Sequence, residues 1–112
     1  MTEQDELHRR NPVEYPKGTP PLEEEVAADL AASIDADWER DGTRLLRRTW
    51  TFKDFNAAFG FATRVALVVE RAFHHPELTI GWGRVTVGLT THTVGGLSEN
   101  DFIVAAKLDR LS

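Results

Sequence analysis

The chain has 112 residues, a formal net charge of −5, 41% hydrophobic and 28% charged residues, and no cysteine. These values fit a single globular domain and exclude disulfides, thiolate zinc sites and cysteine nucleophiles. No apolar run reaches the roughly 20 residues of a membrane span, and the first residues lack the apolar stretch of a signal peptide. The acidic balance argues against general nucleic-acid binding. We therefore expect a cytoplasmic protein that binds neither membrane nor nucleic acid.

Residues 1–19 are polar and show no hydrophobic periodicity, so they are predicted to form a flexible N-terminal lead, with the folded domain spanning 20–112. A first helix is expected at the start of this domain, because Pro20 and Pro21 suit the first turn of a helix. The apolar residues that recur every four positions predict its buried face and an end near 33–35. They are Leu22, Val26, Leu30 and Ile34.

The dipeptide Asp41-Gly42 predicts a two-residue hairpin turn between strands over 37–40 and 43–52. Three arginines of the second strand are interpreted as solvated positions, because no run of aromatic residues interleaves with them as a nucleic-acid surface would require. They are Arg44, Arg47 and Arg48.

A central helix is predicted from Phe55 to 72 or 73, with Asp54 as its N-terminal cap. Pro76 restricts the residue before it to extended geometry, so this helix must end by about His74. Its apolar stripe is predicted to lie in the core. The stripe consists of Phe55, Phe59, Ala62, Ala66 and Val69.

A second hairpin is expected over 77–82 and 85–91, with a tight turn at Gly83-Arg84. In the register set by that turn, His75 lies opposite His92, and directly opposed residues have Cβ atoms about 5 Å apart on one face.

The strand then ends at Gly95-Gly96. Ser98 and Asp101 resemble a capping box at the start of a last helix over 99–111. The element order α-β-β-α-β-β-α predicts an α+β fold, with a four-stranded antiparallel sheet and helices packed on one face.

Three of the four histidines, His74, His75 and His92, are predicted to converge with the carboxylates of Glu70 and Asp101. One interpretation is a metal site, since imidazole and carboxylate both bind zinc. Adjacent residues of an extended chain point to opposite sides, however, which disfavours two neighbouring histidines on one ion. The other interpretation is acid–base chemistry, because histidine titrates near pH 6.5. Several histidines suit a dehydration. The sequence contains no nucleophile elbow, phosphate-binding glycine loop or dinucleotide fingerprint.

The pattern Glu70-x-x-x-His74-His75-Pro76, Trp82, Thr91-His92, Gly96-Leu97-Ser98 and Asp101 resembles the signature of the pterin-4a-carbinolamine dehydratases. The segment FKDFNAAFGFATRVALVVE is similar to the central helix of that family. The resemblance extends over residues 22–111.

The resemblance implies dehydration of 4a-hydroxytetrahydropterin to quinonoid dihydropterin, a step in the recycling of tetrahydrobiopterin for aromatic amino-acid hydroxylases. It implies no metal and no organic cofactor. By the same resemblance, His74, His75 and His92 supply the acid and the base, and Asp101 orients or charge-stabilises a histidine. Four further residues are expected at the substrate. Glu70 would hold His74, Trp82 would wall the pterin pocket unless it is core, and Pro76 and Thr91 would frame the site.

The resemblance also implies self-association as a dimer or tetramer. The competing interpretation is a non-catalytic protein-binding module, either a dimerisation cofactor of a transcription regulator or an assembly factor. The enzyme is favoured, because a pure binding module has no reason to keep every histidine and Asp101 at catalytic spacing.

Overall fold

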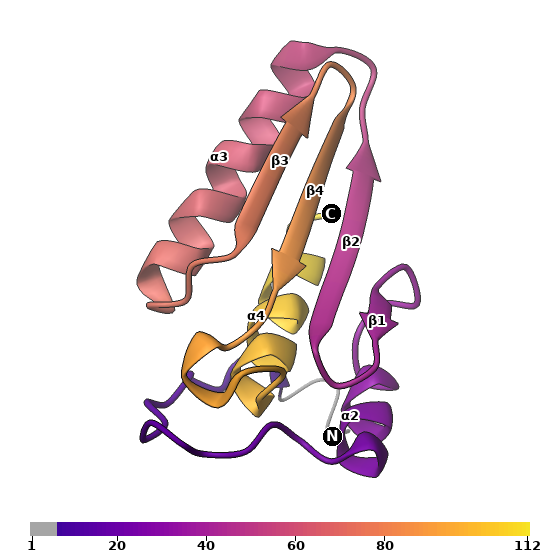
Figure 1. Ribbon diagram of the computed structural model, residues 1–112. Helices are drawn as coiled ribbons and strands as arrows, with labels where there is room; N and C mark the ends of the chain where they lie inside the picture. Colours follow the sequence, from indigo (N-terminus) through magenta and orange to yellow (C-terminus); the bar gives the residue numbers. More distant parts are fainter. Residues whose placement is uncertain (1–6) are drawn as a thin grey trace.

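The computed structural model describes residues 7–112, and within them it has three α-helices and a four-stranded antiparallel sheet (Figure 1). The predicted α+β fold and its element order are therefore confirmed. In chain order the elements are α2 (Glu24–Ala31), β1 (Glu39–Asp41), β2 (Leu45–Thr51), α3 (Phe55–Arg71), β3 (Glu77–Gly81), β4 (Arg84–Leu89), the 3-10 helix η1 (His92–Val94) and α4 (Glu99–Asp109).

The sheet has the strand order β1-β2-β4-β3, so the two hairpins join through β2 and β4. Side chains alternate across β2 and β4, and the buried set faces α3 and α4, which lie together on one side of the sheet (Figure 1). This buried set comprises Leu46, Arg48, Trp50, Val85, Val87 and Leu89. The opposite face of the sheet carries no helix in the described part of the chain, so it is open to solvent.

The second hairpin turns at Trp82 and Gly83, one residue earlier than predicted, and it pairs Ile80 with Val85. The predicted pairing of His75 with His92 is therefore wrong, and His92 instead begins η1 beyond the strand. Moving the turn by one residue shifts the pairing between the two strands by two residues. Each side chain therefore stays on its expected face, so the alternation of apolar residues could not distinguish the two registers.

The turn of the second hairpin contains a glycine because its backbone lies very close to the end of β2. The Phe52 backbone N–H donates to the Gly83 carbonyl at 2.7 Å, and a Cβ at Gly83 would lie 2.9 Å from the Phe52 oxygen. Any larger residue would have to push the two segments apart.

The first hairpin is also looser than predicted. Asp41 pairs with Leu45 across a three-residue loop, in which Gly42 has a φ of 55°. The first helix likewise begins later, at Glu24, with both prolines before it. The extended segment there docks through the Leu22 N–H, which donates to the Leu97 carbonyl at 2.9 Å.

Asp54 caps α3 as predicted, accepting from the Ala57 N–H at 2.8 Å, but the buried face of this helix differs from the predicted stripe. Phe55 and Phe59 are 49% and 52% exposed. The helix is apolar on more than one face, and the face that packs carries Phe61, whose ring lies 5.0 Å from that of Trp50. The buried residues of α3 are Ala58, Phe61, Ala62, Val65 and Val69.

Arg48 of β2 was predicted to be solvated, but it is only 7% exposed. Its guanidinium lies 4.5 Å from the Trp50 ring centroid and donates to Asp109 at 2.6 Å. Trp38 donates to the same Asp109 oxygen at 2.7 Å. This arginine ties the sheet to the end of α4.

Residues 7–19, which we call the N-terminal arm, pack along α4 where a flexible lead was expected. Leu7 is fully buried, and the Asn100 side chain forms two hydrogen bonds with the Val13 backbone, at 2.9 and 2.6 Å. Lys107 donates to the His8 carbonyl at 2.7 Å. Residues 1–6 of the predicted lead lie outside the described residues.

No helix within residues 7–112 has the length and apolar character needed to cross a membrane.

Candidate active site

A buried pair, His74 and Asp101, joins the loop after α3 to the first turn of α4. The Asp101 side chain is inaccessible to solvent, and one of its oxygens lies 2.6 Å from His74 Nε2. The other oxygen accepts from the Thr91 hydroxyl at 2.8 Å and from the Ser98 N–H at 2.9 Å. Three donors therefore satisfy this buried carboxylate.

The local sequence explains how Asp101 performs two roles at once. As the third residue of α4, it reaches back to the N–H of the capping residue Ser98, which is the acidic half of a capping box. Its second oxygen remains free to bind His74. The helix cap and the histidine contact, which were alternatives on the sequence, thus coexist.

The other two histidines line a pocket of about 330 Å³ on the helix-free side of the sheet. His75 reaches it from the residues before β3, and His92 reaches it from the start of η1. This volume lies at the lower end of the range for small-molecule sites, about 300–1,000 Å³. The complete lining is Arg44, Leu45, Arg47, His75, Pro76, Glu77, Gly88, Thr90 and His92.

Two expected site residues lie elsewhere than predicted. Glu70 faces His75 and not His74, with 3.5 Å between its carboxylate and Nε2, and both side chains are largely exposed. Trp82 is 71% exposed at the tip of the second hairpin and belongs neither to the core nor to the pocket lining. Thr91 is buried behind the pocket, in the Asp101 network.

Sequence reasoning missed the part of the pocket that the strands contribute. Arg44 and Arg47 were interpreted as solvated positions, and Glu77 and Gly88 were not considered as site residues. The signal that would have found them is the strand register. In the observed register Gly88 lies between Arg47 on β2 and Glu77 on β3.

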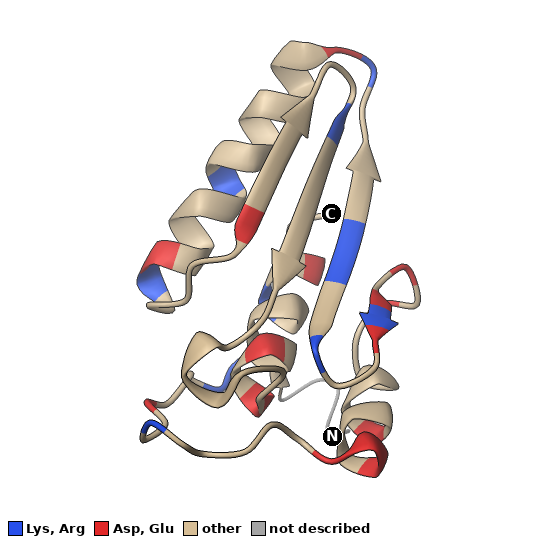
Figure 2. Ribbon diagram, viewed as in Figure 1, with Lys and Arg blue, Asp and Glu red and all other residues tan. Residues whose placement is uncertain are grey.

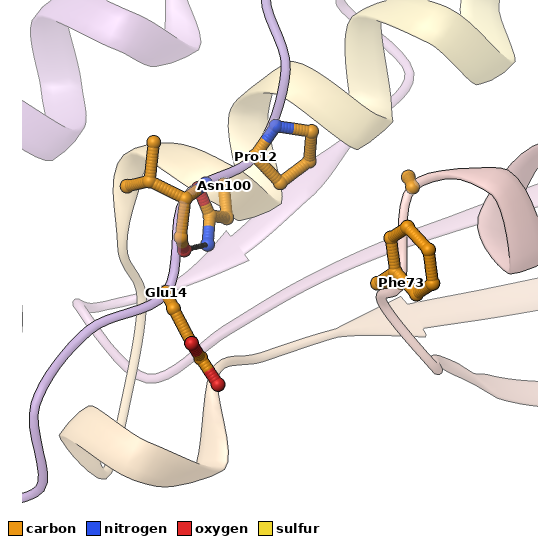
Figure 3. A pocket seen from close by; sticks show the side chains of 6 residues that line it. Pro12, Glu14, Phe73 and Asn100 are labelled. Atoms are coloured by element: carbon orange, nitrogen blue, oxygen red, sulfur yellow. Dashed lines mark hydrogen bonds between the residues drawn. The ribbon is translucent and has the colours of Figure 1, made fainter.

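A second cavity, of about 410 Å³, lies between the N-terminal arm and the end of α3 (Figure 3). Pro12, Glu14 and Asn100 line one side, and Phe73 lines the other. Phe73 is 89% exposed and has a φ of 53°, a backbone conformation that costs a non-glycine residue about 1–3 kcal/mol. This strained residue directly precedes the two histidines and sets the direction in which the chain enters them.

Among residues 7–112, no group of three or more His, Cys, Asp or Glu side chains is arranged to hold a metal ion. The pocket instead presents the imidazoles of His75 and His92 to a ligand. The fold and this pocket together define a small α+β protein with a histidine-lined cavity.

The comparisons with known proteins agree. The family model for pterin 4 alpha carbinolamine dehydratase matches residues 20–111. A relative from Rubrobacter xylanophilus that carries the family's name is 40% identical over 106 residues, which cover 95% of this chain and 98% of the relative. The chain therefore belongs to the pterin-4a-carbinolamine dehydratase family, and it is a hydro-lyase.

Solved structures show the same fold. The crystal structure of a transcriptional coactivator/pterin dehydratase from Brucella melitensis superposes with a TM-score of 0.73 at 36% identity, covering 81% of this chain and 97% of that one. A pterin dehydratase-like protein identified as a RuBisCO assembly factor gives a TM-score of 0.56 at 22% identity, covering 67% of this chain and 88% of that one. The second likeness concerns the fold alone.

Proposed function

We propose that this protein dehydrates 4a-hydroxytetrahydropterin to quinonoid dihydropterin, with His75 and His92 as the general acid and base, in the recycling of tetrahydrobiopterin. The observation that carries the proposal is that both imidazoles line one pocket of about 330 Å³. A functional link to an aromatic amino-acid hydroxylase, which uses the recycled cofactor, is part of the same proposal.

The reaction requires two proton transfers. The lone pair on N5 forms the C4a=N5 bond as the C4a–O bond breaks, and the departing hydroxyl takes a proton from the acid and leaves as water. The base accepts the proton from N5, so the pair of histidines ends with the same total number of protons. Imidazoles serve both roles because their ordinary pKa of about 6.5 allows protonated and neutral forms near neutral pH.

The buried pair His74–Asp101 supports this chemistry from behind the pocket. His74 is 9% exposed and does not line the pocket, so we assign it and Asp101 as positioning residues. The bond between them fixes the loop that carries His75 and, through Thr91, the chain segment that carries His92. Pro76 lines the pocket beside His75, and Glu70 faces the His75 imidazole from α3.

The test is dehydration of a synthetic 4a-hydroxytetrahydropterin by the wild type and by His75→Ala and His92→Ala. Each variant loses a positioned proton transfer, so we expect kcat to fall by about 10²–10⁴-fold. His8→Ala is the matched control, because His8 lies in the N-terminal arm outside the pocket lining. Wild-type rates in both folded pocket variants would show that these imidazoles do not perform the chemistry.

We further propose that the protein self-associates as a dimer or tetramer through the outer face of α3. Phe55, Phe59 and Leu67 are 49%, 52% and 63% exposed on that face. The two phenylalanine rings lie 5.8 Å apart and form one continuous apolar surface. The same surface supports the second candidate function, a protein-binding module, in which a different protein would cover it.

A further inference from the structure

Three residues lie side by side across the outer face of the sheet, and the middle one is a glycine, which has no side chain. Gly88 on β4 pairs with Arg47 on β2 and with Glu77 on β3. Figure 2 shows the basic band of β2 and the acidic start of β3 on either side of β4. Neighbouring strands are about 4.8 Å apart, so the backbones of the two charged residues are separated by about 10 Å.

The glycine in this row is not required by the backbone or by crowding. Gly88 does not have a positive φ. A Cβ at Gly88 would lie 3.7 Å from Leu45 Cδ1 and 3.9 Å from Glu77 Cβ, which are ordinary van der Waals contacts. The consequence of the missing side chain is therefore an open floor between the two charges.

The charges on either side of this floor have no partners among residues 7–112. In the part of the chain that the structure describes, neither the Arg47 nor the Glu77 side chain forms a hydrogen bond or an ion pair. The neighbouring Arg44, by contrast, pairs with Asp41. Arg47 therefore presents an unpaired guanidinium to whatever occupies the pocket.

The charge balance of the pocket opposes that of the whole chain. The charged residues of the lining are two arginines against a single carboxylate, whereas the protein carries a net charge of −5. A concave site lined mainly by one sign of charge attracts ligands of the other sign. A guanidinium also presents a planar fork of donors that matches phosphate and carboxylate oxygens.

We propose that Arg47 makes the pocket selective for pterins whose ring substituent carries an anionic group, a phosphate or a carboxylate. The ring lies over the floor at Gly88, with its reacting edge toward His75 and His92, and the substituent extends to Arg47. This inference rests on the proposed dehydratase function and names the substrate class of the same pocket.

The test compares two 4a-hydroxytetrahydropterins, one with a neutral hydroxymethyl substituent and one with its phosphate monoester. The measured quantity is the ratio of kcat/KM for the anionic substrate to that for the neutral one. In Arg47→Gln this ratio should fall by about 10–100-fold, the equivalent of a lost charge-assisted hydrogen bond. Arg64→Gln, an exposed arginine on α3 outside the pocket, should leave the ratio unchanged. A third substrate with a carboxylate substituent identifies which anion is preferred.

The outcomes separate this inference from the proposed function. If the wild type turns over the neutral pterin and the ratio is the same in Arg47→Gln, the selectivity is wrong and the dehydratase assignment stands. If neither substrate reacts, the dehydratase assignment fails, and the selectivity is then tested by binding alone. The Kd of the oxidised, stable hydroxymethylpterin phosphate, measured by fluorescence titration, should be at least tenfold weaker in Arg47→Gln than in the wild type. Its wild-type Kd should weaken as salt is added. Equal Kd values in both proteins would overturn the selectivity.

Discussion

Asp101 shows at the scale of a single residue how one carboxylate serves both fold and site. One oxygen holds His74, and the other holds the start of α4 together with Thr91. Because the side chain is inaccessible to solvent, no water molecule replaces a lost partner. The residue is thus more sensitive to replacement than an exposed acid.

We expect Asp101→Asn to lower the free energy of unfolding by about 1–3 kcal/mol, the cost of leaving a buried polar group unsatisfied. The amide nitrogen cannot accept the hydrogen bonds that the second carboxylate oxygen now accepts. The measurement is urea unfolding, with Asp29→Asn, an exposed acid of α2, as the control. A stability equal to that of the control variant would contradict the role we give to this network.

Two glycines allow a matched comparison of the same substitution. A Cβ at Gly96 would lie 2.7 Å from the Thr43 carbonyl oxygen and 3.0 Å from Pro21 Cβ, whereas Gly88 has room for one. Gly96→Ala should destabilise the protein by about 1–3 kcal/mol, as overpacking does. Gly88→Ala should not destabilise it, because glycine is the less favourable residue in a strand. Thermal unfolding of both variants tests this, and equal effects would mean that the crowding at Gly96 relaxes without cost.

At the scale of elements, the N-terminal arm is the feature that the sequence pattern gave least reason to expect. Its contacts with α4 are mostly through backbone groups, as at Val13 and His8, and through the single buried Leu7. None of these contacts produces a hydrophobic period, so a polar stretch with prolines was interpreted as flexible.

Tyr15 reports whether the arm is docked. Burial, followed by the nearby carboxylate of Glu99, raises the pKa of Tyr15 above its ordinary value of about 10. The folded state therefore binds the phenolic proton more tightly than the unfolded state. This contribution to stability is present below pH 10 and is lost as the pH rises through the folded pKa.

An alkaline absorbance titration measures this pKa directly, because the chain contains a single tyrosine. The tyrosinate midpoint should lie above 10 in the native protein and return to about 10 in denaturant. The denatured sample is the control for the tyrosine itself. Identical midpoints in the two samples would place the arm in solvent.

At the scale of the whole molecule, the exposed face of α3 is the surface through which we propose that copies of the protein associate. An apolar face on an otherwise charged surface marks an interaction site. We expect Phe59→Glu to reduce the mass measured by light scattering after gel filtration, because it places a charge in the middle of that face. Trp82→Glu changes a more exposed aromatic residue on the second hairpin and should leave the mass unchanged. A monomeric wild type would refute self-association and favour the binding-module interpretation of this face.

The sequence predicted the fold because its signals are local. Asp54 caps α3, and the capping box formed by Ser98 and Asp101 begins α4, as expected from residues only three positions apart. The wrong register of the second hairpin arose from a preference that is also local. A glycine was assigned to the turn for its conformational freedom, whereas Gly83 is there because Phe52 approaches it.

The sequence by itself determined the order of elements, the face on which the apolar strand residues lie and the grouping of the histidines near one end of the sheet. These properties depend on periodicity and capping, which neighbouring residues specify. Only the tertiary structure decided that His74 is buried with Asp101 while His75 and His92 line a pocket, and that Arg47, Gly88 and Glu77 form its floor. Those arrangements depend on which strands pair and which helix face packs. Both depend on contacts between residues distant in the chain, and a local pattern leaves several such pairings nearly equal in energy.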